Sequence, residues 1–175
     1  MKRIFLIGYM GAGKTTLGKA LAHYLSYEFI DLDWYIEDKI GQSIPSFFTD
    51  SGEAAFREIE HHSLLELLEK ERVVIATGGG APCYYDNMDL MLKSGVVVHL
   101  KASEEVLFRR LKDTLHLRPV LQSKTEEELR AFIASSLANR YPYYNRAAQV
   151  INADFLESEE EIRQTINLLI KTLNF

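Results

Sequence analysis

Eight residues near the N-terminus have the types and the spacing of a phosphate-binding loop. The segment Gly8-Tyr9-Met10-Gly11-Ala12-Gly13-Lys14-Thr15 fits the pattern G-x-x-x-x-G-K-[ST]. Its glycines let backbone N–H groups curl around phosphate oxygens, and a helix starting behind it adds a positive dipole end. Lys14 can reach the β- and γ-phosphates of a nucleotide, and the Thr15 hydroxyl can ligate Mg²⁺. The loop therefore predicts a site for a nucleoside triphosphate.

Two carboxylates follow at the end of a second apolar run, Phe29–Leu32. Strand alternation places Asp31 and Asp33 on the same face, and the carboxyl ends of parallel strands line the ligand crevice. We expect Asp31 to position the metal, directly or through water, and Asp33 to accept a proton from an attacking hydroxyl. The alternative for Asp33 is that it caps a helix starting at Trp34.

The segment after the third apolar run narrows the class of nucleotide enzyme. Val73–Ala76 is followed by Thr77-Gly78-Gly79-Gly80, where a motor or remodelling ATPase usually carries a pair of acids. Three glycines allow close approach of a ligand and offer N–H donors, although a plain turn is the alternative. The guanine-reading pattern N-K-x-D is absent from the sequence. These features favour a small-molecule kinase.

Three arginines are candidates for holding an anionic acceptor or the phosphates. Arg57 precedes Glu60 by three residues on a predicted helix, close enough to pair with it. Arg140 lies just before Pro142, which is expected to disrupt the helix. Arg118 lies in an irregular stretch from which it can fold over phosphates as a lid. Taken singly, each is equally well explained as a solvated surface charge.

The elements that must position these residues alternate between strand and helix. Five short runs read as buried strands: Ile4–Ile7, Phe29–Leu32, Val73–Ala76, Val96–Leu100 and Gln149–Asn152. Helical periodicity lies between them, and Thr125 with Glu128 and Ser158 with Glu161 form capping boxes. Residues 34–60 and 112–124 interrupt the alternation as long insertions, which are more often functional than idle. The pattern predicts an α/β fold with a parallel sheet.

Length and composition limit the remaining possibilities. The 175 residues carry a formal net charge of −5 and suffice for one domain, residues 1–175. An acidic chain has no general electrostatic reason to bind nucleic acid, so no nucleic-acid partner is expected. Apolar runs reach only four residues, against the ~20 that a membrane helix needs, so no membrane contact is expected. The single cysteine, Cys83, fits a reducing cytoplasm.

Taken together, these motifs resemble the shikimate kinase family over nearly the whole chain. The resemblance rests on the phosphate loop, the Asp31/Asp33 pair, and the run from Gly52-Glu53 through Phe56-Arg57 to Glu60. It continues in Thr77–Gly80, Arg118-Pro119 and Arg140-x-Pro142-x-Tyr144. It implies a three-layer α/β/α P-loop kinase fold with a five-stranded parallel sheet. In that fold, 34–60 is a helical shikimate-binding insertion and 112–124 is a lid.

The resemblance also implies an activity and a set of roles. The activity is transfer of the γ-phosphoryl group of ATP to the 3-hydroxyl of shikimate, with Mg²⁺ as cofactor, by a monomer. Asp33, Lys14 and Arg118 would be catalytic, and Thr15 and, through water, Asp31 would serve the metal. The other implied contacts are Gly11, Ala12, Gly13, Lys14, Thr15, Thr16, Arg110 and Arg118 for ATP, and Asp33, Arg57, Gly79, Gly80 and Arg140 for shikimate. Glu60 would orient Arg57, and Arg110 would stack on adenine.

Two other hypotheses stay open on the sequence alone. A related small-molecule kinase, acting on gluconate or a nucleoside monophosphate, would share the phosphate loop. A regulatory module that binds ATP without turnover would share it too, although intact Lys14, Thr15 and Asp33 argue against that.

Overall fold

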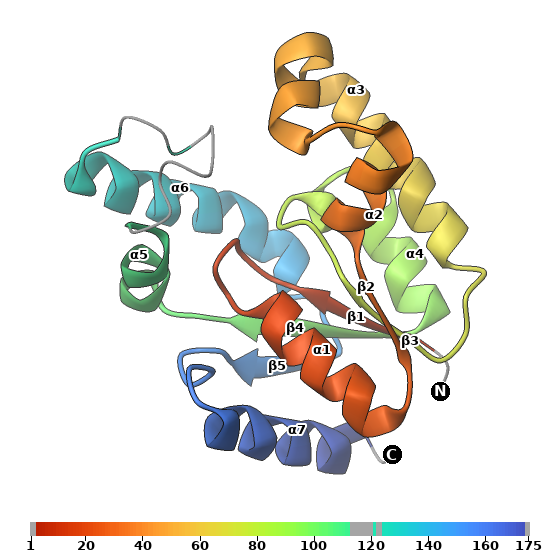
Figure 1. The fold of residues 1–175 in the computed structure, drawn as a ribbon. Coiled ribbons are helices and arrows are strands. Elements are labelled where there is room, and N and C mark those ends of the chain that lie inside the picture. The colour runs from red at the N-terminus through yellow and green to blue at the C-terminus, as the bar shows by residue number, and fades with distance from the viewer. Residues whose placement is uncertain (1–2, 113–120, 122–123, 174–175) are drawn as a thin grey trace.

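A parallel five-stranded sheet forms the centre of the molecule (Figure 1). The computed structural model describes residues 3–112, 121 and 124–173. The strand order is β2-β3-β1-β4-β5. Their bounds are β1 Arg3–Ile7, β2 Glu28–Asp31, β3 Val73–Ala76, β4 Val96–Lys101 and β5 Gln149–Asn152. The five predicted strands and their parallel pairing are confirmed.

Alternate residues of β1 supply two separate cores, one on each face of the sheet. Ile4 and Leu6 point into a core shared with α1, α5, α6 and α7, whereas Phe5 and Ile7 point into a core shared with α2, α3 and α4. All four side chains are fully buried. This burial on both faces is why the strand reads as a continuous apolar run.

Seven α-helices cover the sheet in the described part of the chain, giving three layers (Figure 1). Their bounds are α1 Lys14–Leu25, α2 Leu32–Ile40, α3 Ile44–Leu67, α4 Asn87–Ser94, α5 Glu104–Lys112, α6 Glu126–Tyr144 and α7 Glu159–Leu173. A 3₁₀ turn, η1, spans Ala81–Cys83. Both predicted capping boxes form: Glu128 N donates to Thr125 Oγ at 3.2 Å, and Glu161 N donates to Ser158 Oγ at 3.2 Å. No helix in these ranges has the length and apolar character of a membrane span.

The second strand ends earlier than the sequence pattern predicts, which changes the setting of Asp33. Strand β2 stops at Asp31, and α2 already begins at Leu32. Asp31 Oδ1 accepts a hydrogen bond from Asp33 N at 3.1 Å, so Asp31 is the N-cap and Asp33 lies in the first helical turn. The expectation that both carboxylates share a strand face is therefore wrong, as is the alternative that Asp33 is the cap.

Pro142 behaves differently from the sequence expectation, whereas Pro45 lies in the first turn of α3, where a missing N–H costs nothing. Gly52 is the actual irregularity, because its φ of 79° kinks α3. Pro142 lies inside α6, which continues to Tyr144. Arg140 is therefore held on a helix.

Most of the predicted lid, 113–120 and 122–123, lies outside the described residues.

Candidate active site

The phosphate loop joins β1 to α1 and curls as its glycines require. Gly13 takes a left-handed φ of 93° at the N-cap of α1. At Gly8 a Cβ would lie 2.5 Å from the Leu100 carbonyl oxygen, so no side chain fits there. Ala12 is buried with its side chain in the core, which leaves only its backbone to face a nucleotide. The loop amides at the helix N-terminus have an arrangement that can bind an anion, and binding of a nucleotide there stays a prediction.

The Lys14 ammonium lies across this loop. Its Nζ donates to the carbonyl oxygens of Gly8 at 2.8 Å and Tyr9 at 3.0 Å. These contacts hold a positive charge beside the loop, where the terminal phosphates of a nucleotide would lie. Thr16, which is also a predicted ATP contact, is exposed in the first turn of α1.

Thr15 and Asp31 meet between the loop and the start of α2. Thr15 Oγ1 donates to Asp31 Oδ2 at 2.7 Å. The described residues contain no cluster of three or more His, Cys, Asp or Glu side chains suited to a metal. Mg²⁺ commonly takes only one or two protein oxygens, with water and phosphate completing its shell. An adjacent hydroxyl and carboxylate beside the phosphate loop fit that donor set.

Asp33 and Glu60 converge on Gly78, at the carboxyl end of β3. A Cβ at Gly78 would lie 2.8 Å from Asp33 Oδ1 and 2.8 Å from Glu60 Oε1. Burial raises the pKa of Glu60 to about 7, opposed by the charge of Arg57 and helped by that of Asp33. In the described part of the chain, the buried Oε1 of Glu60 has no hydrogen-bond partner. The carboxylates of Asp33 and Glu60 thus both lie against Gly78, and one oxygen of Glu60 is available as an acceptor.

Arg57 is fixed between carboxylates and a glycine. Its NH1 pairs with Glu60 Oε2 at 2.6 Å, as the three-residue spacing predicts. A Cβ at Gly80 would lie 2.7 Å from Arg57 NH2, so the guanidinium packs directly on the Gly80 backbone. Burial works against the charge, but Glu60 and Glu53 outweigh it and raise the pKa of Arg57. The guanidinium is therefore a largely buried, permanent cation.

Arg140 approaches the same glycines from α6, one turn before the C-terminal end of that helix. A Cβ at Gly79 would lie 3.0 Å from Arg140 NH1, and the guanidinium carbon lies 5.1 Å from the centre of the Tyr9 ring. NH1 is buried and has no hydrogen-bond partner among the described residues. Tyr144, one turn later, donates its hydroxyl proton to Gly79 O at 2.5 Å. The sequence motif includes Tyr144 but does not reveal that it holds this loop.

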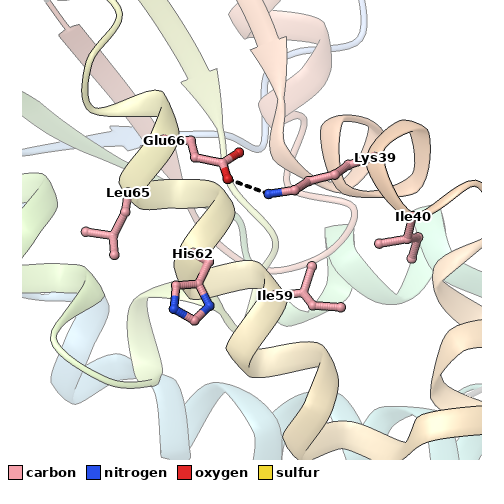
Figure 2. Close-up of a pocket in the computed structure, with 6 residues that line it drawn as sticks. All are labelled: Lys39, Ile40, Ile59, His62, Leu65 and Glu66. Carbon is pink, nitrogen blue, oxygen red and sulfur yellow. Dashed lines mark hydrogen bonds and ion pairs between the residues drawn. The ribbon is translucent and has the colours of Figure 1, made fainter.

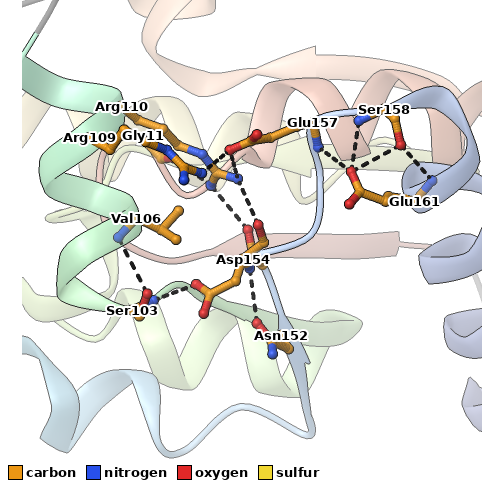
Figure 3. Close-up of polar contacts among 11 residues, drawn as sticks. Gly11, Ser103, Val106, Arg109, Arg110, Asn152, Asp154, Glu157, Ser158 and Glu161 are labelled. Atoms are coloured by element: carbon orange, nitrogen blue, oxygen red, sulfur yellow. Dashed lines mark hydrogen bonds and ion pairs between the residues drawn. The ribbon is translucent and has the colours of Figure 1, made fainter.

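Arg110 links the phosphate loop to the segment after β5 (Figure 3). Its NH1 donates to the carbonyl oxygens of Gly11 at 3.2 Å and Ala153 at 3.0 Å. Asp154 accepts from Ser103 N at 2.7 Å and so fixes that segment against α5. Arg110 therefore borders the nucleotide loop, and its stacking on adenine stays a prediction. Arg118 lies outside the described residues.

Two surface pockets differ in their relation to this site. One of about 410 Å³ is lined by Glu53, Ala54, Arg57, Tyr84 and Tyr85, and therefore borders the Arg57 cluster. The other, of about 580 Å³, lies between α2 and α3 (Figure 2). It is lined by Lys39, Ile40, Ile59, His62, Leu65 and Glu66, with Lys39 paired to Glu66 at 2.5 Å. No predicted site residue lines this second pocket.

Comparisons with known proteins agree with the geometry. Residues 10–171 match the family model described as shikimate kinase. Curated shikimate kinases of Bacteroides thetaiotaomicron and Parabacteroides distasonis are 51% and 50% identical over 173 residues. They cover 99% of this chain and 99% and 100% of their own lengths.

Solved structures give the same result. The crystal structure of shikimate kinase from Bacteroides thetaiotaomicron has a TM-score of 0.92 at 49% identity, covering 99% of this chain and 98% of that one. Shikimate kinase from Acinetobacter baumannii, in complex with shikimate, has a TM-score of 0.86 at 34% identity, covering 99% and 94%.

Proposed function

Because the chain belongs to the shikimate kinase family, we propose that its site residues divide one phosphoryl transfer between a nucleotide end and an acceptor end. The reaction moves the γ-phosphoryl group of ATP to the 3-hydroxyl of shikimate. It yields shikimate 3-phosphate and ADP on the route to chorismate and the aromatic amino acids. The observation that carries the division of roles is the convergence of Arg57, Arg140, Asp33 and Glu60 on Gly78–Gly80.

The nucleotide end is the phosphate loop. The loop residues Gly11–Thr16 hold the phosphates, with Lys14 reaching the β- and γ-phosphates and Arg110 beside the base. Thr15 and Asp31 would hold Mg²⁺, Asp31 through water. When bound, Mg²⁺ neutralises phosphate charge that develops in the transition state. The 2.7 Å contact between Thr15 and Asp31 supports this pairing.

The acceptor end recognises the carboxylate and one hydroxyl of shikimate. The cations of Arg57 and Arg140 bind the carboxylate, and the buried, unpartnered NH1 of Arg140 supports that role. Gly79 and Gly80, which lie against the guanidinium groups of Arg140 and Arg57, contribute backbone contacts to the substrate. Glu60 holds Arg57 in place through the 2.6 Å ion pair.

The chemical step proceeds at Asp33. The 3-hydroxyl oxygen attacks the γ-phosphorus, a new P–O bond forms, and the bond to the β-phosphate oxygen breaks to release ADP. The hydroxyl proton passes to the Asp33 carboxylate. Lys14 and Arg118 stabilise charge on the transferring group. Arg118 belongs to the 112–124 segment, which we propose acts as the lid.

We also propose that the enzyme is a cytoplasmic monomer with one catalytic domain, residues 1–175, that binds neither nucleic acid nor membrane. The single cysteine supports the cytoplasmic location, and the net charge of −5 supports the lack of a nucleic-acid partner. Light scattering after size exclusion tests the monomer, since a dimer would double the measured mass.

A coupled assay of ADP release tests the function. Mg·ATP is offered with shikimate, gluconate, AMP or no acceptor in parallel. We expect turnover that depends on shikimate alone. Turnover with gluconate or AMP would keep the nucleotide end and overturn the acceptor end. ATP binding without turnover on any acceptor would favour a regulatory module.

A further inference from the structure

One face of the Arg57 guanidinium is covered by residues whose role the family motifs do not explain. Oε1 of Glu53, one turn earlier on α3, accepts from Arg57 Nε at 3.3 Å and from Arg57 NH2 at 3.1 Å. The same oxygen accepts the Tyr84 hydroxyl at 2.8 Å. The guanidinium carbon also lies 4.2 Å from the centre of the Tyr84 ring. Tyr84 thus contacts Arg57 twice, once directly and once through Glu53.

These contacts fix which N–H groups Arg57 can offer. A guanidinium has five N–H donors. Glu53 takes one on Nε and one on NH2, and Glu60 takes one on NH1. One N–H therefore remains on each terminal nitrogen, and these two donors are available to a carboxylate. The Arg57 side chain is only 12% exposed, so little water competes for that pair.

The Tyr84 hydroxyl gives Glu53 a second hydrogen-bond partner besides Arg57. The Glu53 side chain is 55% exposed, so the surrounding packing restrains it little. The hydrogen bond from the Tyr84 hydroxyl is the largest single cause that lowers the pKa of Glu53. Loss of that hydroxyl leaves Glu53 held by Arg57 alone, so the Nε edge of Arg57 is fixed less firmly.

We propose that Tyr84 is a positioning residue for recognition of the shikimate carboxylate. Its ring packs on the guanidinium of Arg57, and its hydroxyl fixes Glu53 on the Nε edge, so that the two remaining N–H groups face the substrate. This inference rests on the proposed role of Arg57 as a carboxylate ligand. Tyr84 itself is not assigned any contact with shikimate.

Tyr85 offers a matched control. It lines the same 410 Å³ pocket and is more exposed, at 58%. Its ring packs on His61 at 4.8 Å between ring centres, away from the Arg57 contacts. A change of Tyr85 to leucine removes a neighbouring aromatic ring while the Tyr84–Glu53–Arg57 contacts remain.

The test compares Tyr84→Leu, Tyr84→Phe and Tyr85→Leu in steady-state kinetics with each substrate varied in turn. We expect Tyr84→Leu to raise the KM for shikimate about tenfold, because a stacking contact and a charged hydrogen bond are both lost. Tyr84→Phe keeps the ring and should raise that KM about threefold. The KM for ATP should stay the same in all three, and Tyr85→Leu should behave as the parent enzyme.

A second substrate separates positioning from a general structural effect. Methyl shikimate has no carboxylate charge for Arg57 to hold, so Tyr84→Leu should not change turnover of this ester relative to the parent enzyme. Thermal unfolding checks that each variant folds. Should Tyr84→Leu fail to fold, the threefold effect of Tyr84→Phe, absent with the ester, carries the test.

Three results would overturn the inference. One is equal behaviour of the Tyr84 and Tyr85 variants. Another is a raised KM that persists with the ester. The third is a lower KM in Tyr84→Phe, which would mean that Glu53 competes with the substrate carboxylate. Arg57→Lys distinguishes failure of this inference from failure of the proposed function. If Arg57→Lys leaves the KM for shikimate unchanged, the role of Arg57 as a carboxylate ligand is itself wrong.

Discussion

Replacing Gly80 by alanine adds one methyl group at the most crowded point of the acceptor end. The backbone of Gly80 has φ −87° and ψ −22°, which alanine adopts without strain. The new Cβ would lie 2.7 Å from Arg57 NH2, 2.9 Å from NH1 and 3.0 Å from the guanidinium carbon. Since ordinary contact begins near 3.4 Å, the guanidinium must retreat by about 0.7 Å.

That retreat is opposed by the partners of Arg57. Glu60 holds NH1 at 2.6 Å, and the Tyr84 ring lies 4.2 Å from the guanidinium carbon. We therefore expect loss of one charge-assisted hydrogen bond to the substrate carboxylate, about 1.5–3 kcal/mol. Because each 1.4 kcal/mol is a factor of ten, the KM for shikimate should rise about 10- to 150-fold. The KM for ATP should not change.

Two comparisons check the reasoning behind this number. In an Arg57→Ala background the methyl group meets no guanidinium, so Gly80→Ala should have no further effect on the KM for shikimate. Gly41→Ala is the control for a glycine change elsewhere: its Cβ meets nothing within 4 Å, but its φ of 69° is strained for alanine. It should lower the unfolding midpoint without altering the KM. An equal effect of Gly80→Ala in both backgrounds would refute the argument.

Three further predictions follow from the geometry. Asp33→Asn removes the proposed proton acceptor, so kcat should fall about 10²- to 10⁴-fold while ATP affinity by calorimetry is retained; normal turnover would contradict the assignment. Glu60 has a pKa of about 7 when folded against 4.5 as the ordinary value. Because the folded protein binds this proton more tightly, the contribution of Glu60 to the free energy of unfolding is fully present below pH 4.5. It is lost as pH rises through 7, so the parent protein should lose stability relative to Glu60→Gln over this range. If urea unfolding gives the same pH dependence of the free energy of unfolding for both proteins, the raised pKa of Glu60 is contradicted. Thr125→Ala removes the cap of α6 and should cost about 1 kcal/mol of unfolding free energy, measured by urea unfolding, with both KM values intact; a raised KM would show that the cap also positions Arg140.

The phosphate loop and the Arg57–Glu60 pair could be predicted from sequence because their geometry is local. A glycine loop between strand and helix has few conformations, and a three-residue spacing on a helix brings two side chains together. The end of β2 could not be predicted, because Asp31 can either extend a strand or cap a helix. The hydrogen bond from Asp33 N decided for the cap.

The tertiary parts of the site left weaker signals. Tyr84 meets Glu53 across 31 residues of sequence, and no periodicity relates them. Pro142 suggested a break at Arg140, yet packing of α6 keeps it in the helix to Tyr144. The buried state of Tyr144, which brings its hydroxyl to Gly79, is likewise a property of the assembled core.

The Asp31 carboxylate gives this position an unusual evolutionary constraint. One oxygen accepts from Thr15 on α1 and the other from the backbone at the start of α2. A replacement that kept only the hydrogen bond from Thr15 would uncap α2 and displace Asp33 in its first turn. A replacement that kept only the cap would release Thr15. A substitution of Asp31 therefore affects both α1 and α2, and a single compensating change in one helix would not restore both contacts.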